Sequence, residues 1–173
     1  MMENTDFVNE ACDRAHRMIE AGVPRKEILN CLVTAAENVA ARGAVSSILV
    51  LDEHGLLRNG ASPNLPADYL DAIDRLKPDP CVGTCAAAAA TGSVVVTPDF
   101  LADGKWTELR HLPLSLGFVG AWSMPIKSAK SGEVLGTFGT YYRDLRQPTE
   151  REFAAVRLLA QAAARALDRN DTD

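Results

Sequence analysis

Apolar side chains recur with helical spacing near the start of the chain and predict two helices there. Residues 6–20 form the first apolar stripe, and Gly22 and Pro24 follow where that helix should end. A second stripe begins after Pro24, a residue that suits the first turn of a helix, and Gly43 is expected to stop it. The first part of the chain is therefore expected to be a pair of helices.

A further amphipathic helix is predicted near the end of the chain. Thr149 and Glu152 have the Thr-x-x-Glu spacing of a capping box, so this helix should begin at Thr149 and continue to about Asp168. Its apolar stripe is Phe153, Val156, Ala160, Ala163 and Leu167. Small residues let helices approach closely, so the stripe predicts the seam of a homodimer. Packing of the helix on its own sheet is the alternative, and both can hold.

Runs of β-branched and aromatic residues between these helices predict strands. The runs cover residues 44–51, 56–60, 94–96, 118–126 and 133–142. Turn residues at 52–55 and 131–132 join four of them into hairpins, which indicates a mainly antiparallel sheet. Shorter helices are expected over 67–76, 81–91 and 106–116. Helices before, between and after hairpin-linked strands are typical of an α+β fold.

Charge and composition exclude several classes of function. The net charge is −5 and the Lys and Arg residues are scattered, so no nucleic-acid partner is expected. No apolar run reaches the roughly 18 residues of a spanning helix, and the acidic start lacks the features of a secretion signal. We therefore expect a cytoplasmic protein with no membrane partner, whose four cysteines stay reduced.

Several motifs, in their order and spacing, resemble the GAF domain family. They read VGTCAAA at 82–88, VVVTPD at 94–99, Trp106, GFVGAWSMPI at 117–126, GEVLGTF at 132–138 and PTE at 148–150. The subtype most resembled is the GAF module of bacterial sensor kinases and cyclic-dinucleotide enzymes. The resemblance divides the chain into an N-terminal helix (1–24), a GAF domain (25–169) and a disordered tail (170–173).

The resemblance implies a five- or six-stranded antiparallel sheet with the terminal helices on one face. Inserted helices and loops would cover a ligand cavity on the other face. Family members bind cyclic nucleotides, haem, bilins, iron or small metabolites, so the family name leaves the ligand and any cofactor unknown. The signature of the cyclic-nucleotide binders is absent from this sequence. Bilin attachment uses a cysteine next to a histidine, and neither Cys81 nor Cys85 has an adjacent histidine.

Cys81 and Cys85 are the first candidates for chemistry at this cavity. Four residues apart, they could form a redox pair, an attachment site or a soft metal site. Cys85 also resembles a position used by free methionine-R-sulfoxide reductases, which are enzymes with the GAF fold. Those enzymes place a further cysteine later in the chain, where residues 108–112 contain none here. We therefore expect packed thiols, no catalytic residue and no metal site.

The remaining candidates are one histidine and a group of aromatic residues. His111 could be the axial ligand of a haem, or a partly exposed helix residue. The full set of ligand-binding candidates is Cys81, Cys85, Trp106, His111, Phe118, Trp122 and Phe138. Because side chains alternate along a strand, only one face of each strand can meet the cavity, and the sequence leaves open which.

Taken together, the residues and the resemblance predict a regulatory module that senses a small molecule. It would dimerise through its terminal helices and pass the change caused by the ligand to a downstream signalling protein. Two alternatives remain: an enzyme like the free methionine-R-sulfoxide reductases, and a dimerisation scaffold with no ligand. The volume of the cavity separates the sensor from the scaffold.

Overall fold

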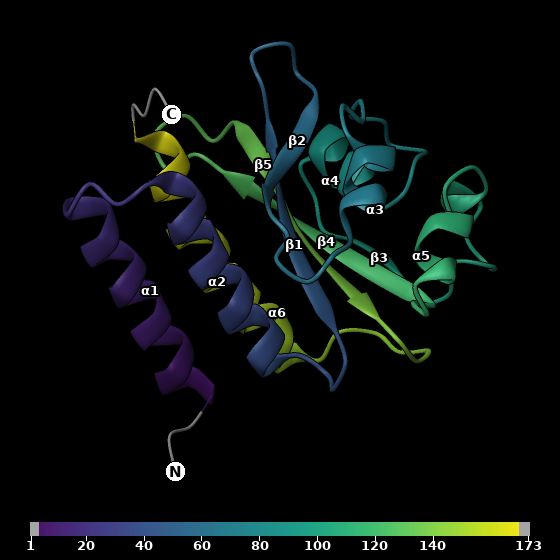
Figure 1. Cartoon of the computed structure of the whole chain (residues 1–173), viewed down its shortest axis with the longest axis horizontal. Helices are drawn as coiled ribbons and strands as arrows, with labels where there is room; N and C mark the ends of the chain where they lie inside the picture. The colour runs from purple at the N-terminus through teal and green to yellow at the C-terminus, as the bar shows by residue number, and fades with distance from the viewer. Residues whose placement is uncertain (1–3, 170–173) are drawn as a thin grey trace.

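A computed structural model describes residues 4–169 of the chain (Figure 1). The helices are α1 (Asn4–Glu20), α2 (Arg25–Val39), α3 (Ala67–Ile73), α4 (Cys85–Thr91), α5 (His111–Ser115) and α6 (Glu150–Asp168), with a 3-10 turn η1 (Gly104–Trp106). The strands are β1 (Val45–Leu51), β2 (Leu57–Ala61), β3 (Val95–Thr97), β4 (Gly120–Lys127) and β5 (Val134–Tyr142). The tail predicted over 170–173 lies outside the described residues.

The strands form one antiparallel sheet in the order β2-β1-β5-β4-β3. β4 and β5 make a long hairpin in which Gly120 lies opposite Tyr142. β1 pairs with the other edge of β5, so that Ser47 lies opposite Gly139. The predicted α+β fold is confirmed, with five strands in the described part of the chain.

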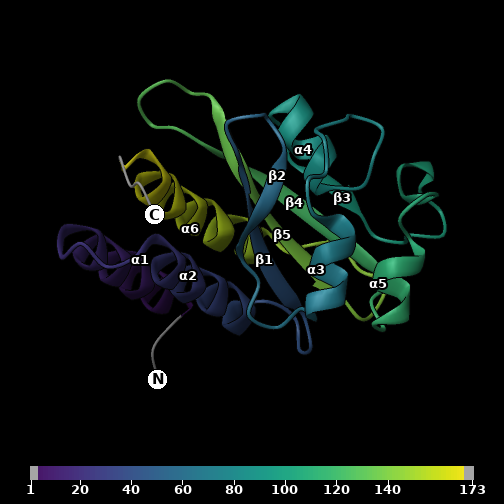
Figure 2. The same cartoon turned by 45° about the horizontal axis from the view of Figure 1, so that its top comes forward.

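Two layers of helices enclose the sheet (Figures 1 and 2). α2 and α6 lie on one face with α1 packed against both of them, and α3, α4 and α5 lie on the other face. Each face has its own apolar core. Alternation along the strands divides the side chains between the two cores, so Trp122 faces the terminal helices while Ala121 faces the opposite layer.

α6 packs its alanine-rich stripe inside the chain. Val156, Ala160 and Ala163 are buried in the core that α6 shares with α1, α2 and the sheet. At these positions, α6 therefore packs on its own sheet and helices, which was the alternative to a dimer seam. The exposed apolar side chain on this helix is Leu158. The Oγ1 atom of Thr149 accepts a hydrogen bond from the backbone N–H of Glu152 at 3.1 Å, which confirms the predicted cap.

Two short segments differ from the prediction near the cavity. The helix expected over 81–91 begins only at Cys85, because Gly83 adopts φ +56° and turns the chain before it. Cys81 therefore does not share a helix with Cys85. The helix expected over 106–116 is divided into η1 and α5. Pro113 lacks an N–H and would clash with a preceding helical turn, so it lies within the first turn of α5.

The second helix also ends earlier than expected, at Val39, and Gly43 instead provides the turn before β1 with φ +81°. Among residues 4–169, no helix combines the length and the apolar character that crossing a bilayer requires.

Candidate functional site

A small cavity lies on the sheet face covered by α3, α4 and α5. Leu49 of β1 and Tyr141 of β5 form its floor, and the rest of the wall is Tyr69, Ile73, Leu76, Gly83, Thr84, Cys85, Ala86, Trp106, Leu109 and Leu112. The cavity has a volume of about 20 Å³, which is room for about one water molecule. The wall is mostly apolar and contains no charged side chain.

Two tyrosine hydroxyls give this wall a polar point. Tyr69 of α3 donates a hydrogen bond to the hydroxyl of Tyr141 at 2.7 Å, and the two rings meet edge to face. Burial raises the pKa of both hydroxyls, so both stay protonated at neutral pH. Tyr141 therefore keeps a hydroxyl proton that no described residue accepts, and this proton could be donated to a ligand.

A row of small residues, two of them serines, lies beneath Cys85. Ser47, Gly139 and Ser123 are neighbours across β1, β5 and β4. The hydroxyl of Ser123 lies 3.0 Å from the sulfur of Cys85 and donates to Thr84 at 2.9 Å. Burial raises the pKa of the Cys85 thiol more than the surrounding hydroxyls lower it. The sulfur is therefore a neutral thiol at neutral pH, and the thiol is the unreactive form.

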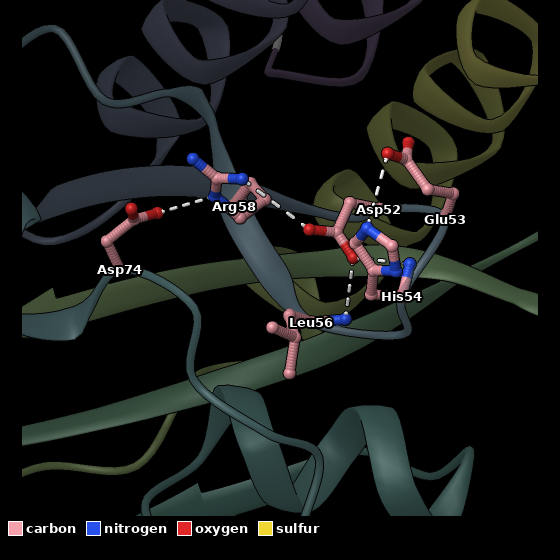
Figure 3. Close-up of polar contacts among 6 residues, drawn as sticks. All are labelled: Asp52, Glu53, His54, Leu56, Arg58 and Asp74. Carbon is pink, nitrogen blue, oxygen red and sulfur yellow. Dashed lines mark hydrogen bonds and ion pairs between the residues drawn. The ribbon is translucent and has the colours of Figure 1, made fainter.

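Helix α3, which covers one side of the cavity, is anchored to the edge strand β2 (Figure 3). The guanidinium of Arg58 contacts Asp74 at 2.7 Å and Asp52 at 3.5 Å. Leu57 also pairs with the chain after α3, donating to the carbonyl of Leu76 at 2.9 Å. Because Leu76 and Ile73 belong to the cavity wall, this anchor holds one side of the cavity closed.

We expect acid to release this anchor only when the pH falls below the ordinary pKa of an aspartate. The hydrogen bond from Arg58 lowers the pKa of Asp74. The pKa of Asp52 is lowered mainly by the hydrogen bond from the backbone N–H of Leu56, and further by the one from His54. The charged forms stabilise the fold, so their contribution is complete above about pH 3.9, the unfolded value, and is lost as the pH falls through the lower folded values. NMR shifts of the Leu57 and Arg75 amides should therefore titrate with a midpoint below the unfolded value.

The matched variants for this titration are Asp74→Asn and Asp71→Asn. Asp74→Asn should remove the Asp74 part of this titration and leave the part due to Asp52, whereas Asp71→Asn, an exposed change on the same segment, should leave both intact. A midpoint at or above the ordinary aspartate value would contradict the anchor.

Comparison with known proteins identifies the family. The sequence profile of the GAF domain matches residues 23–168. The chain belongs to the GAF domain family.

This GAF domain is similar in sequence to part of a sensor, and similar in fold to other proteins that include an enzyme. The methyl sulfide methyltransferase-associated sensor of Methanosarcina acetivorans is 33% identical over 157 residues, which are 90% of this chain and 16% of that protein. The GAF domain thus spans about a sixth of the curated relative it matches. A domain of a two-component sensor histidine kinase from Sinorhizobium meliloti superimposes with a TM-score of 0.70 at 19% identity, covering 84% of this chain and 92% of that chain.

The free methionine-R-sulfoxide reductase of Neisseria meningitidis, in complex with its substrate, has a TM-score of 0.73 at 16% identity. That comparison covers 95% of this chain and 87% of the reductase. Likeness at this identity shows the shared fold alone. The fold is therefore common to sensors and to an enzyme, and the residues of the site must separate them.

The GAF domain brings only some of the predicted candidates together. Cys85 and Trp106 belong to the cavity wall. Phe118 lies beside the wall, with its ring centroid 5.3 Å from that of Tyr141. Trp106 is held by a hydrogen bond from its indole N–H to Thr97 at 3.2 Å.

The other candidates lie elsewhere. Trp122 and Phe138 are on the opposite sheet face, in the core under the terminal helices. Cys81 is exposed in the turn before α4, and His111 is exposed at the start of α5. The haem hypothesis requires that His111 face an apolar slot, and its side chain is exposed instead. Among residues 4–169, no three His, Cys, Asp or Glu side chains are grouped in a way that could hold a metal ion.

The tyrosine pair of the GAF cavity was not among the residues predicted from the sequence. Tyr69 lies in a short helix and Tyr141 near the end of a strand, 72 positions away. A buried tyrosine hydroxyl needs a polar partner, which is the only local signal that the sequence offers. The partner itself follows from how α3 folds back over β5, which no sequence spacing encodes.

Proposed function

We propose that this GAF domain is a sensory module that binds a small, predominantly apolar molecule between the sheet and the α3–α5 layer. The uncharged wall of the cavity is the observation that carries the proposal. The unaccepted proton of Tyr141 would recognise one acceptor atom on the ligand. The name of the Methanosarcina relative, a sensor, supports the sensory role.

The same wall argues against an enzyme that acts on a free amino acid. A zwitterion buried in such a site would leave its ammonium and carboxylate without charged partners, which costs several kcal/mol. Cys85 is a buried neutral thiol, and the other cysteine of the pair is exposed in a separate turn. We therefore propose that the domain is not catalytic, and we expect no turnover of free methionine-R-sulfoxide with a thioredoxin system.

The size of the cavity sets a condition on binding. Drug-sized ligands occupy pockets of roughly 300–1,000 Å³, far more than the 20 Å³ here. The α3–α5 layer must therefore move outward to admit a ligand, and this opening would be the signal. A scaffold with a collapsed pocket is the second candidate function, and the small volume favours it.

We further propose a cytoplasmic homodimer that passes its signal to a downstream protein. The four free cysteines suit a reducing compartment. The alanines of α6 pack within the chain, so they are not available to a partner. The dimer would instead use the accessible surface of α1 and α6, where Leu158 lies beside the half-buried Cys12 and Ile19. Sedimentation that shows only a monomer at high micromolar concentration would refute the dimer.

The ligand proposal is tested by thermal unfolding with neutral and charged versions of one probe. Native mass spectrometry and an absorption spectrum of freshly purified protein come first, to detect any co-purified molecule. Indole at millimolar concentration should then raise the unfolding midpoint, because a ligand that binds only the folded state stabilises it. Indole-3-carboxylate should not, because its charge has no partner in the wall.

Two tryptophan variants locate the binding site of the probe. Ile73→Trp fills the cavity and should abolish stabilisation by indole, whereas Leu101→Trp adds the same ring at a position that is 64% exposed and should not. Equal stabilisation by both probes, or a response to neither probe together with no co-purified molecule, would favour the scaffold.

A further inference from the structure

We propose that the last two residues of β5, Tyr141 and Tyr142, and the next residue, Arg143, couple the cavity lid to the first turn of α6, where the lid is the α3–α5 layer that covers the cavity. In the proposed sensor, this coupling would carry the signal from the ligand to α6. That role rests on the proposed function, whereas the coupling itself does not. β5 lies between α6 and α3 (Figure 2), so its two faces meet the two helical layers. Adjacent residues on the strand therefore touch opposite layers of the molecule.

Tyr141 makes the contact with the lid. Its hydroxyl accepts the hydrogen bond from Tyr69 of α3 at 2.7 Å, and its ring lies 5.9 Å from that of Tyr69 between centroids. Both residues belong to the cavity wall. A ligand that enters beneath α3 must therefore separate or reorient this pair.

Tyr142 makes the contact with α6. Its hydroxyl donates to the carboxylate of Glu152 and accepts from the indole N–H of Trp122 at 2.9 Å. Glu152 lies in the first turn of α6 and is only 5% exposed, so its carboxylate is removed from solvent together with the tyrosine. Trp122 also packs on Phe153, the next residue of α6, with ring centroids 4.8 Å apart. The start of α6 is thus fastened to the strand end by a buried, charge-assisted hydrogen bond.

Arg143 ties the same strand end to two loops. Its guanidinium donates to the carbonyl of Leu116, just after α5, at 2.9 Å, and to the carbonyl of Gly43, just before β1, at 3.1 Å. The guanidinium also lies 4.4 Å from the centroid of Phe118, which packs against Tyr141. Movement of the α5 end of the lid would therefore reach the same three residues.

The coupling follows from the stiffness of the strand between these contacts. Tyr141 pairs with Val45 and Ala121, and the carbonyl of Tyr142 accepts from Val119 at 2.8 Å. Tyr141 is thus paired on both sides, and Tyr142 is paired with Gly120 of β4, so a displacement at one of them passes in part to the other. Loosening the lid should therefore loosen the first turn of α6, and the reverse should hold because coupling between two sites is reciprocal.

Amide hydrogen exchange of the ligand-free protein tests this directly. Tyr69→Phe removes the lid hydrogen bond and should speed exchange in α3 and also in residues 150–157, by about threefold or more, the size expected for one lost bond. In the background of Tyr142→Phe with Glu152→Gln, where the link to α6 is cut without leaving an unpaired buried charge, Tyr69→Phe should no longer affect residues 150–157.

The reciprocal experiment starts from α6. Glu152→Gln weakens the bond to Tyr142 and should speed exchange in residues 67–73. Glu150→Gln makes the same chemical change at an exposed position in the same turn and should leave residues 67–73 unchanged. Thr91→Val, which removes a hydroxyl bond within α4, is the control for a general loosening of the lid layer and should not affect residues 150–157.

An effect of Tyr69→Phe that stays within α3, or that persists in residues 150–157 after the link is cut, would overturn the proposal. Because no ligand is used, failure here leaves the sensory proposal standing. Failure of the indole experiment likewise leaves the coupling intact.

Discussion

Replacing Trp122 by alanine is expected to lower the free energy of unfolding by about 3–5 kcal/mol. The side chain is 1% exposed and fills the space between β4 and the first turns of α6. The substitution removes its packing on Phe153 and also leaves Tyr142 without the indole N–H that it accepts. The effect should be large because a cavity and a lost hydrogen bond arise at the same place.

Urea denaturation measures this change, with two comparison variants. Trp122→Phe keeps a ring but loses the N–H, so it should cost clearly less. Leu101→Ala removes an exposed side chain and should stay within about 0.5 kcal/mol of wild type. Normal stability of Trp122→Ala together with loss of ligand binding would contradict the structure and return Trp122 to the ligand site that the sequence suggested.

The elements of this fold could be predicted because their signals are local. A capping box marks the start of α6, and glycine and proline mark the end of α1. The hairpin turns between β1 and β2 and between β4 and β5 are likewise indicated by a few neighbouring turn residues. The order of hairpins and helices then restricts the possible architectures to an antiparallel sheet with helical layers.

The faces of the strands could not be assigned in the same way. β4 is buried along most of both faces, so alternation separates Trp122 from Ser123 without saying which layer each one meets. Large aromatic residues were the natural choice for a cavity lining. In the structure, Trp122 and Phe138 instead fill the core under α6, while small residues such as Ser123 and Gly139 let α4 approach the sheet closely.

The geometry around Cys85 was also beyond local patterns. A spacing of four residues places two cysteines on one helical face only if a helix includes both, and the left-handed turn at Gly83 prevents this. The thiol pair and the tyrosine pair thus show the same limit. Contacts set by how one layer folds over another depend on backbone turns and close approaches that are not visible as periodicity.

Adding a single methyl group at Gly139 should test that close approach of α4. A Cβ there would lie 3.0 Å from the sulfur of Cys85 and 3.3 Å from the hydroxyl of Ser123. Cys85 is buried between α4 and the sheet, and the cavity that it lines has a volume of only about 20 Å³, so the sulfur has little room to retreat. We expect Gly139→Ala to destabilise the fold by about 1–3 kcal/mol, the usual cost of overpacking a core.

The companion variant Cys85→Ala separates overpacking from any other effect of the change. Removing the sulfur vacates the space that the new methyl group needs, so the double variant should be more stable than the sum of the two single changes predicts. Contacting residues commonly show interaction energies of about 0.5–3 kcal/mol in such a cycle, which chemical denaturation of the four proteins would measure. Gly104→Ala is the control, since a Cβ there meets no atom within 4 Å and should change stability little. Strictly additive single effects, or a Gly139→Ala variant as stable as Gly104→Ala, would mean that α4 does not rest on the sheet at Gly139 and that the cavity wall is looser than its volume indicates.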